Sequence, residues 1–145
     1  MVEERQADAP VVVVGFDGSK DSRRALEWAA AECELRGSAL TVLHADRWTP
    51  AALGLPAFHE EAGIEEDVLA RGVGLVRQGH PTVDVTGRRI APPPGESLVA
   101  DAGHASLLVL GSRGLGRIQQ VAMGSVSRYC VEHAHCPAVV VRVDA

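Results

Sequence analysis

Aromatic side chains make up only 3% of this 145-residue sequence, although 46% of its residues are hydrophobic. The core must therefore be built from valine, leucine and alanine, which is typical of a parallel sheet covered by helices. No apolar run approaches the roughly 20 residues that a membrane-spanning helix requires. The length is that of one domain, so we expect a single domain over residues 10–145.

Basic residues are also scarce: the 14 Lys and Arg residues are outnumbered by 19 Asp and Glu residues, so the net charge is −5. The basic residues form no tail or stripe in the sequence. Nonspecific nucleic-acid binding requires clustered positive charge, so no nucleic-acid partner is expected. Residues 1–9 lack the apolar core of a secretion signal and are expected to form a disordered tail. The cysteines number three, an odd count that fits reduced thiols better than disulfides. We therefore expect a cytoplasmic protein with no membrane partner.

Short apolar runs alternate with longer segments of helical periodicity along the chain. Strands are expected at residues 11–14, 39–45, 82–89, 107–110 and 138–143, and helices at about 20–36, 58–78, 96–103 and 125–133. Residues 46–56 and 92–95 are expected to be irregular connections, because they are interrupted by proline and glycine. Either Ser19 or Asp21 could cap the first helix. The pattern specifies a doubly wound, Rossmann-like α/β domain, which binds ligands beyond the carboxyl ends of its strands.

A glycine-rich loop follows the fourth predicted strand. Gly111 ends that strand, Gly114 and Gly116 follow, and Gly124 precedes a new helical segment that starts near Ser125. Glycines allow backbone N–H groups to approach a ligand closely, because no Cβ intervenes. The helix start adds unpaired N–H groups and the positive end of its dipole. This combination predicts an anion site, and the expected anion is phosphate.

The spacing Gly111-x2-Gly114-x9-Gly124-Ser125 resembles the nucleotide-binding signature of the ATP-binding branch of the universal stress protein family. The resemblance covers nearly the whole chain, including Gly-Phe-Asp-Gly-Ser at residues 15–19 and His-Cys-Pro-Ala-Val-Val-Val-Arg at residues 135–142. It implies a five-stranded parallel sheet of order 3-2-1-4-5, with helices on both faces. That order would bring the turn after the first strand next to the glycine loop.

The resemblance also implies a role for each residue that matches the signature. Asp17 would contact the nucleoside, and the backbone of Ala45 would contact adenine. Arg113 either binds phosphate or is a solvated surface residue. The full set of expected ATP-binding residues is Gly15, Phe16, Asp17, Ala45, Gly111, Ser112, Arg113, Gly114, Gly124, Ser125, Val126 and Ser127. A Mg²⁺ or Mn²⁺ ion would be held through the phosphates of ATP, because no dedicated carboxylate cage is visible.

Two further sets of residues are of types that could bind a metal or act in catalysis, but packing explains them better. Cys130, His133, His135 and Cys136 could be taken for a zinc site, but no second cysteine pair completes it. His44 lies in a predicted buried strand and is expected to be a hydrogen-bonded core histidine rather than a catalyst.

The leading hypothesis is an ATP-binding stress-response regulator that forms a homodimer through residues 138–143. At most slow ATP hydrolysis is expected, because no Walker lysine or arginine finger can be identified. One alternative is an ATP pyrophosphatase-type adenylating enzyme, whose Ser-Gly-Gly-x-Asp-Ser phosphate loop is loosely imitated by residues 15–22. A second alternative is a dimeric interaction module without nucleotide. Cyclic AMP in place of ATP is also left open.

Overall fold

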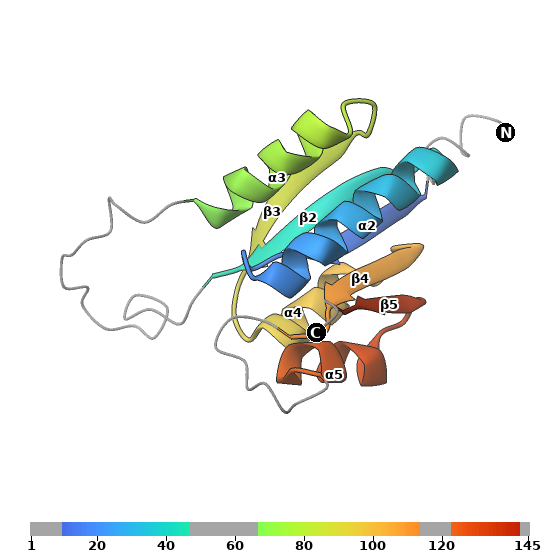
Figure 1. The fold of residues 1–145 in the computed structure, drawn as a ribbon. Helices are drawn as coiled ribbons and strands as arrows, with labels where there is room; N and C mark the ends of the chain where they lie inside the picture. Colours follow the sequence, from blue (N-terminus) through green and yellow to red (C-terminus); the bar gives the residue numbers. More distant parts are fainter. Residues whose placement is uncertain (1–9, 47–66, 114–122, 143–145) are drawn as a thin grey trace, which may run out of the picture.

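The computed structural model describes residues 10–46, 67–113 and 123–142 (Figure 1). In chain order the elements are β1 (Val11–Gly15), α2 (Lys20–Arg36), β2 (Ala39–Ala45), α3 (Val68–Gly79), β3 (Val85–Ile90), α4 (Pro94–Asp101), β4 (Leu107–Gly111), α5 (Ser125–His133) and β5 (Ala138–Val141). The alternation of strands and helices is the one expected for a doubly wound domain.

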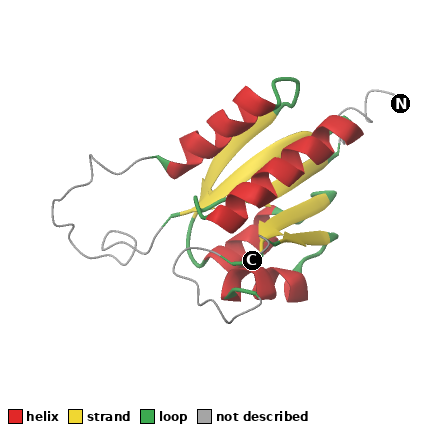
Figure 2. Cartoon of the chain, in the orientation of Figure 1, coloured by secondary structure: helices red, strands yellow, loops and turns green. Residues whose placement is uncertain are grey.

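The five strands form one parallel sheet in the order β3-β2-β1-β4-β5. This confirms the expected order 3-2-1-4-5 and the fold class. β1 lies at the centre, with β2 on one side and β4 on the other. Helices cover both faces of the sheet, as Figure 2 shows. Among the described residues, no helix is long and apolar enough to cross a membrane.

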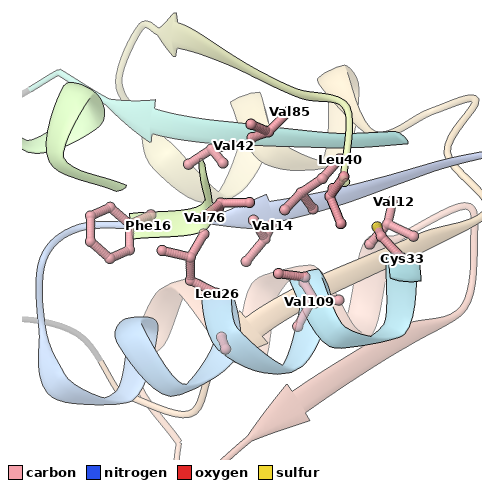
Figure 3. Close-up of a cluster of buried hydrophobic side chains, with 14 of the residues drawn as sticks. Val12, Val14, Phe16, Leu26, Cys33, Leu40, Val42, Val76, Val85 and Val109 are labelled. Carbon is pink, nitrogen blue, oxygen red and sulfur yellow. The ribbon is translucent and has the colours of Figure 1, made fainter. Parts of the chain in front are cut away.

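The core is aliphatic and divided into two clusters by the sheet. Val12 and Val14 belong to the cluster beneath α2 and α3, while Val13 belongs to the cluster beneath α4 and α5. Alternate residues of β1 therefore point to opposite faces, and both faces are buried. Figure 3 shows the first cluster, in which Phe16 is the one aromatic side chain among labelled aliphatic ones and Cys33. As expected from the few aromatic residues in the sequence, valine and leucine side chains make up most of the core.

Helix α2 begins and ends as its sequence indicates. The Ser19 side chain accepts a hydrogen bond from the Ser22 amide, and Gly37 ends the helix in a left-handed conformation with φ of 70°. Ser19, rather than Asp21, is therefore the capping residue. Asp21 is instead fully buried. Its carboxylate contacts Ser112 and Arg113, just after β4.

Three predicted boundaries are wrong by a few residues or more. Helix α3 begins at Val68, not near residue 58, because Asp67 is extended and its side chain caps the Ala70 amide. Strand β3 begins at Val85 rather than at residue 82, since the preceding residues form a turn closed by the Val83 amide on the His80 carbonyl. Helix α4 begins at Pro94, inside the predicted connector, because proline is tolerated in the first helical turn.

Some sequence-based predictions fall outside the described residues. They are the tail at residues 1–9, most of the connection at 46–56, residues 58–66 of the second predicted helix, Gly114, Gly116 and residue 143 of the last predicted strand. The last strand itself ends earlier than predicted, at Val141.

Candidate functional site

The candidate site lies where the winding of the sheet reverses. β1 pairs with β4, with Val14 opposite Val109, so the chain segments that follow these two strands begin side by side. β1 leads into α2 on one face of the sheet, and β4 leads toward α5 on the other. In doubly wound sheets this is the position at which ligands bind.

Ser112, the first residue after β4, forms hydrogen bonds to α2, to β5 and to the start of α5. Its amide donates to the Val141 carbonyl over 2.9 Å, and its hydroxyl donates to Asp21 Oδ2 over 2.6 Å. Its carbonyl accepts hydrogen bonds from the Gly124 amide at 2.6 Å and from the Ser127 hydroxyl at 2.8 Å. Both ends of the glycine-rich connection are therefore fixed to one residue at the tip of β4.

Asp21 lies beneath the start of this connection. Its Oδ2 atom accepts the Ser112 hydroxyl and the Arg113 amide, the latter at 3.1 Å, and lies 3.6 Å from Arg113 Nε. Its Oδ1 atom is buried and has no hydrogen-bond partner among the described residues. From the sequence, Asp21 was expected only as a helix cap. The missed signal is the position of Asp21 four residues before Ala25, on the buried stripe of α2.

Gly111 is constrained by packing. A Cβ at this position would lie 2.6 Å from the carbonyl carbon of Asp21 and 2.8 Å from the Ser22 amide nitrogen. From the sequence, this glycine was expected to allow close approach of a ligand. The structure provides another reason, because the first turn of α2 packs directly on the end of β4.

Helix α5 begins at Ser125 as predicted, with Gly124 as its N-cap and no side-chain hydrogen bond at the cap. The first N–H groups of a helix have no partner within the helix, and among the described residues the N-cap offers no side-chain oxygen to them. Ser125 is exposed, Val126 is half-buried and Ser127 is buried. The Ser127 hydroxyl is 2.8 Å from the Ser112 carbonyl, so it holds the helix start instead of facing solvent. The helix start therefore presents backbone donors, the Ser125 hydroxyl and the positive end of the helix dipole.

The turn after β1 forms the opposite side of the site. The Asp17 carboxylate accepts a hydrogen bond from the Ser19 amide over 2.9 Å, and the Asp17 amide donates to the Ser22 hydroxyl over 3.3 Å. Phe16 is buried in the core beneath α3, where its ring would leave no room for a side chain at position 72. Its carbonyl accepts a hydrogen bond from His44 Nδ1 over 2.9 Å. Phe16 therefore positions the turn through its backbone, and His44 is hydrogen-bonded as expected.

The remaining expected residues occupy defined places. Gly15 ends β1, and Ala45 ends the neighbouring strand β2, where it is half-buried. Arg113 is half-buried beside Asp21. Gly114 lies outside the described residues. The structure thus brings the ends of β1, β2 and β4 to one edge of the sheet, as the sequence analysis expected.

The cysteine and histidine residues near the C-terminus have other surroundings. Cys130 is fully buried in the cluster beneath α4 and α5, and burial raises the pKa of its thiol to about 11. His133 stacks on Tyr129, with ring centroids 4.0 Å apart. Among the described residues, no group of three histidine, cysteine, aspartate or glutamate side chains is placed to hold a metal ion.

Comparison with known proteins identifies relatives along almost the whole chain. Residues 10–142 match the model of the universal stress protein family. A universal stress protein of Thermus aquaticus is 32% identical over 133 residues, which cover 90% of this chain and 97% of the relative. One from Mycobacterium tuberculosis is 33% identical over 141 residues, covering 90% of this chain but 46% of its own length. The chain thus spans about half of the mycobacterial relatives.

A solved structure supports the same assignment. The crystal structure of a universal stress protein in complex with cAMP is 25% identical to this chain, with a TM-score of 0.69. The alignment covers 94% of this chain and 98% of that protein. Together with the observed strand order and the family-model match, these similarities show that the chain belongs to the universal stress protein family.

Proposed function

We propose that this protein binds an adenine nucleotide, with ATP as the leading ligand, at the carboxyl edge of β1 and β4. The observation that carries the proposal is the start of α5, which has no side-chain cap and is fixed by Ser112 beside the turn after β1. Helix N-termini of this kind are suited to phosphate. The structural relative in complex with cAMP supports an adenine nucleotide as the ligand class.

The residues around this edge divide into those that contact the ligand and those that hold the site. The amides at the start of α5 and the Ser125 hydroxyl would bind phosphate, Asp17 would accept hydrogen bonds from the nucleoside, and the Ala45 backbone would contact adenine. Ser112 and Ser127 donate their hydroxyl hydrogens to protein oxygens, so we assign both to holding the site.

A divalent cation would accompany ATP. Mg²⁺ binds through few protein ligands and keeps phosphate oxygens and water around it. In the described part of the chain no three acidic, histidine or cysteine side chains converge on a metal position. We therefore propose that Mg²⁺ or Mn²⁺ is held through the phosphates of the bound nucleotide.

The proposed role is that of a cytoplasmic, nucleotide-dependent regulator of the stress response with at most slow ATP hydrolysis. Cys33, Cys130 and Cys136 are free thiols, which agrees with a reducing compartment. We further propose a homodimer that pairs through residues 138–143. β5 is an edge strand of half-buried apolar residues, and an edge strand offers unpaired backbone groups to a second copy. Size-exclusion chromatography with light scattering tests this dimer.

The identity of any nucleotide that copurifies with the protein tests the proposed function. We expect denaturation of the wild-type protein to release ATP or ADP, identified by mass spectrometry, and the Gly124→Asp variant to release none. Wild-type protein that carries no nucleotide and binds none when ATP and Mg²⁺ are added would contradict the proposal. Nucleotide retained by Gly124→Asp would instead favour phosphate binding at residues 15–22, the loop of the adenylating-enzyme alternative.

A further inference from the structure

The Asp21 carboxylate makes its contacts with the residues that open the glycine-rich connection. Its Oδ2 atom receives the Ser112 hydroxyl at 2.6 Å and the Arg113 amide at 3.1 Å. These partners lie 91 and 92 positions further along the chain. The contacts join the first turn of α2 to the end of β4, the two segments that flank the candidate site.

Helix capping does not explain why a carboxylate occupies this position. Ser19 caps α2, so Asp21 is not needed for the helix start. Asp21 is fully buried, and its Oδ1 atom has no hydrogen-bond partner among the described residues. A buried carboxylate with half of its acceptor capacity unused is costly for stability. The residue is therefore better explained by what its Oδ2 atom holds in place.

The residue that Asp21 holds also fixes the phosphate end of the site. Ser112 donates its hydroxyl to Asp21, and its carbonyl receives the Gly124 amide and the Ser127 hydroxyl at the start of α5. A continuous chain of hydrogen bonds thus runs from α2 through the tip of β4 to the N-terminus of α5. Removing the first acceptor would free the Ser112 side chain and leave Ser112 positioned by its backbone hydrogen bonds alone.

Arg113 completes the arrangement. Its Nε atom lies 3.6 Å from Asp21 Oδ2, so the guanidinium compensates a buried negative charge near a site expected to bind phosphate. This placement favours pairing with Asp21 over the direct phosphate contact considered in the sequence analysis.

We propose that Asp21 is a positioning residue of the nucleotide site, which sets the phosphate-binding start of α5 by holding Ser112 and Arg113. The inference rests on the proposed function and deepens it. Because Asp21 acts on the phosphate end, its loss should weaken binding of ATP while leaving binding of adenosine unchanged.

Calorimetric titrations of ATP with Mg²⁺ and of adenosine test the proposal on nucleotide-free wild-type protein and its variants. We expect Asp21→Ala to weaken ATP binding at least about tenfold, which corresponds to about 1.4 kcal/mol. Asp21→Asn keeps an oxygen that can accept from Ser112 and Arg113, so it should retain most of the ATP affinity. Val76→Ala is the matched control: Val76 is buried on α3, away from this network, and its truncation destabilises the fold without touching the loop.

The possible outcomes separate this inference from the proposed function. Wild-type protein that fails to bind ATP would refute the proposed function itself. Wild-type protein that binds ATP, together with an Asp21→Ala variant that binds it equally well, would overturn only the role of Asp21. Equal weakening of ATP and adenosine would also overturn it, because the effect would not be specific to the phosphate end.

A second variant keeps the proposal testable should Asp21→Ala fail to fold. Ser112→Ala removes the hydroxyl that Asp21 accepts but leaves the backbone hydrogen bonds of Ser112 in place. We expect Ser112→Ala to weaken ATP binding and to leave adenosine binding unchanged, because the change removes the contact to Asp21 at the phosphate end only. Unchanged ATP binding, or equal weakening of ATP and adenosine binding, would contradict the proposed link.

Discussion

The Ser127 hydroxyl donates a hydrogen bond to the Ser112 carbonyl over 2.8 Å, across 15 positions of the chain. This contact joins the first turn of α5 to the tip of β4. It fixes the start of the helix next to the end of β4, the strand that pairs with β1. The geometry of the candidate site thus depends on buried hydroxyls as much as on glycines.

Ser127→Ala should therefore weaken ATP binding without unfolding the protein. A neutral hydrogen bond contributes about 1 kcal/mol, so we expect roughly fivefold weaker binding in calorimetric titrations. Ser106→Ala is a matched control, because the Ser106 hydroxyl donates to the Val11 carbonyl over 3.0 Å at the opposite edge of the sheet. Equal ATP affinities for the two variants would contradict the role assigned to Ser127.

Gly111→Ala should destabilise the fold, because its Cβ would lie 2.6 Å from the backbone of Asp21. Overpacking of this kind costs about 1–3 kcal/mol in the free energy of unfolding, measured by urea denaturation. Gly74→Ala provides the contrast, since nothing lies within 4 Å of the added Cβ in α3. That variant should be up to about 1 kcal/mol more stable than wild type, from helix propensity. A Gly111→Ala protein as stable as wild type would argue against direct packing of α2 on β4.

His80 should make stability depend on pH. Its side chain is largely buried, with Nε2 2.7 Å from Glu27 and Nδ1 3.1 Å from Glu34, and the hydrogen bond to Glu27 is the main cause that raises the pKa of His80. A raised pKa means that the folded state binds the proton more tightly than the unfolded state. This stabilisation is complete below about pH 6.5, the unperturbed value, and is lost as the pH rises through the higher folded-state pKa.

Urea denaturation of wild type and His80→Gln across this pH range measures the effect. The stability difference between the two proteins should be largest in mildly acidic buffer and should shrink in alkaline buffer. Glu27→Gln should remove most of this pH dependence, because it removes the main partner. A difference that grew with pH would have the wrong sign for the proposed ion pair.

The three thiols should differ in reactivity. Burial raises the pKa of both Cys33 and Cys130 to about 11, and both side chains are almost completely inaccessible. Cys136 is half-buried, and burial also raises its pKa. We expect a maleimide to modify Cys136 alone in the folded protein, and all three residues in urea, as detected by peptide mass spectrometry. Modification of Cys33 or Cys130 before unfolding would contradict the described core.

The strand order followed from the family resemblance, and most of the elements from local patterns. The apolar run at residues 11–14 indicated β1, and Ser19 was one of the two candidate caps of α2. The start of α3 was predicted wrongly because Asp67 follows a run of acidic residues that suits the first half of a helix, whereas Asp67 is the cap itself. A cap and a first-turn residue share the same amino-acid preference, so composition alone does not separate them.

The candidate site was foreseeable in its position but not in its internal contacts. Glycine spacing and strand ends located the edge of the sheet. The network from Asp21 through Ser112 to Ser127 was not foreseen, because it joins residues 91 and 15 positions apart through side-chain geometry. Ser112 and Ser127 were both expected among the ATP-binding residues. The structure directs those hydroxyls to protein oxygens.

The most direct test of the account is the affinity of nucleotide-free protein for ATP with Mg²⁺, measured by calorimetry for wild type and Gly124→Asp. Aspartate is a good N-cap, so this change should preserve or raise the thermal stability while its carboxylate occupies the first N–H groups of α5 and repels phosphate. Gly74→Asp adds the same charge at an open position of α3 and serves as the control. The account predicts that wild type and Gly74→Asp bind ATP and that Gly124→Asp does not. Undiminished binding by a folded Gly124→Asp protein would contradict phosphate binding at the start of α5.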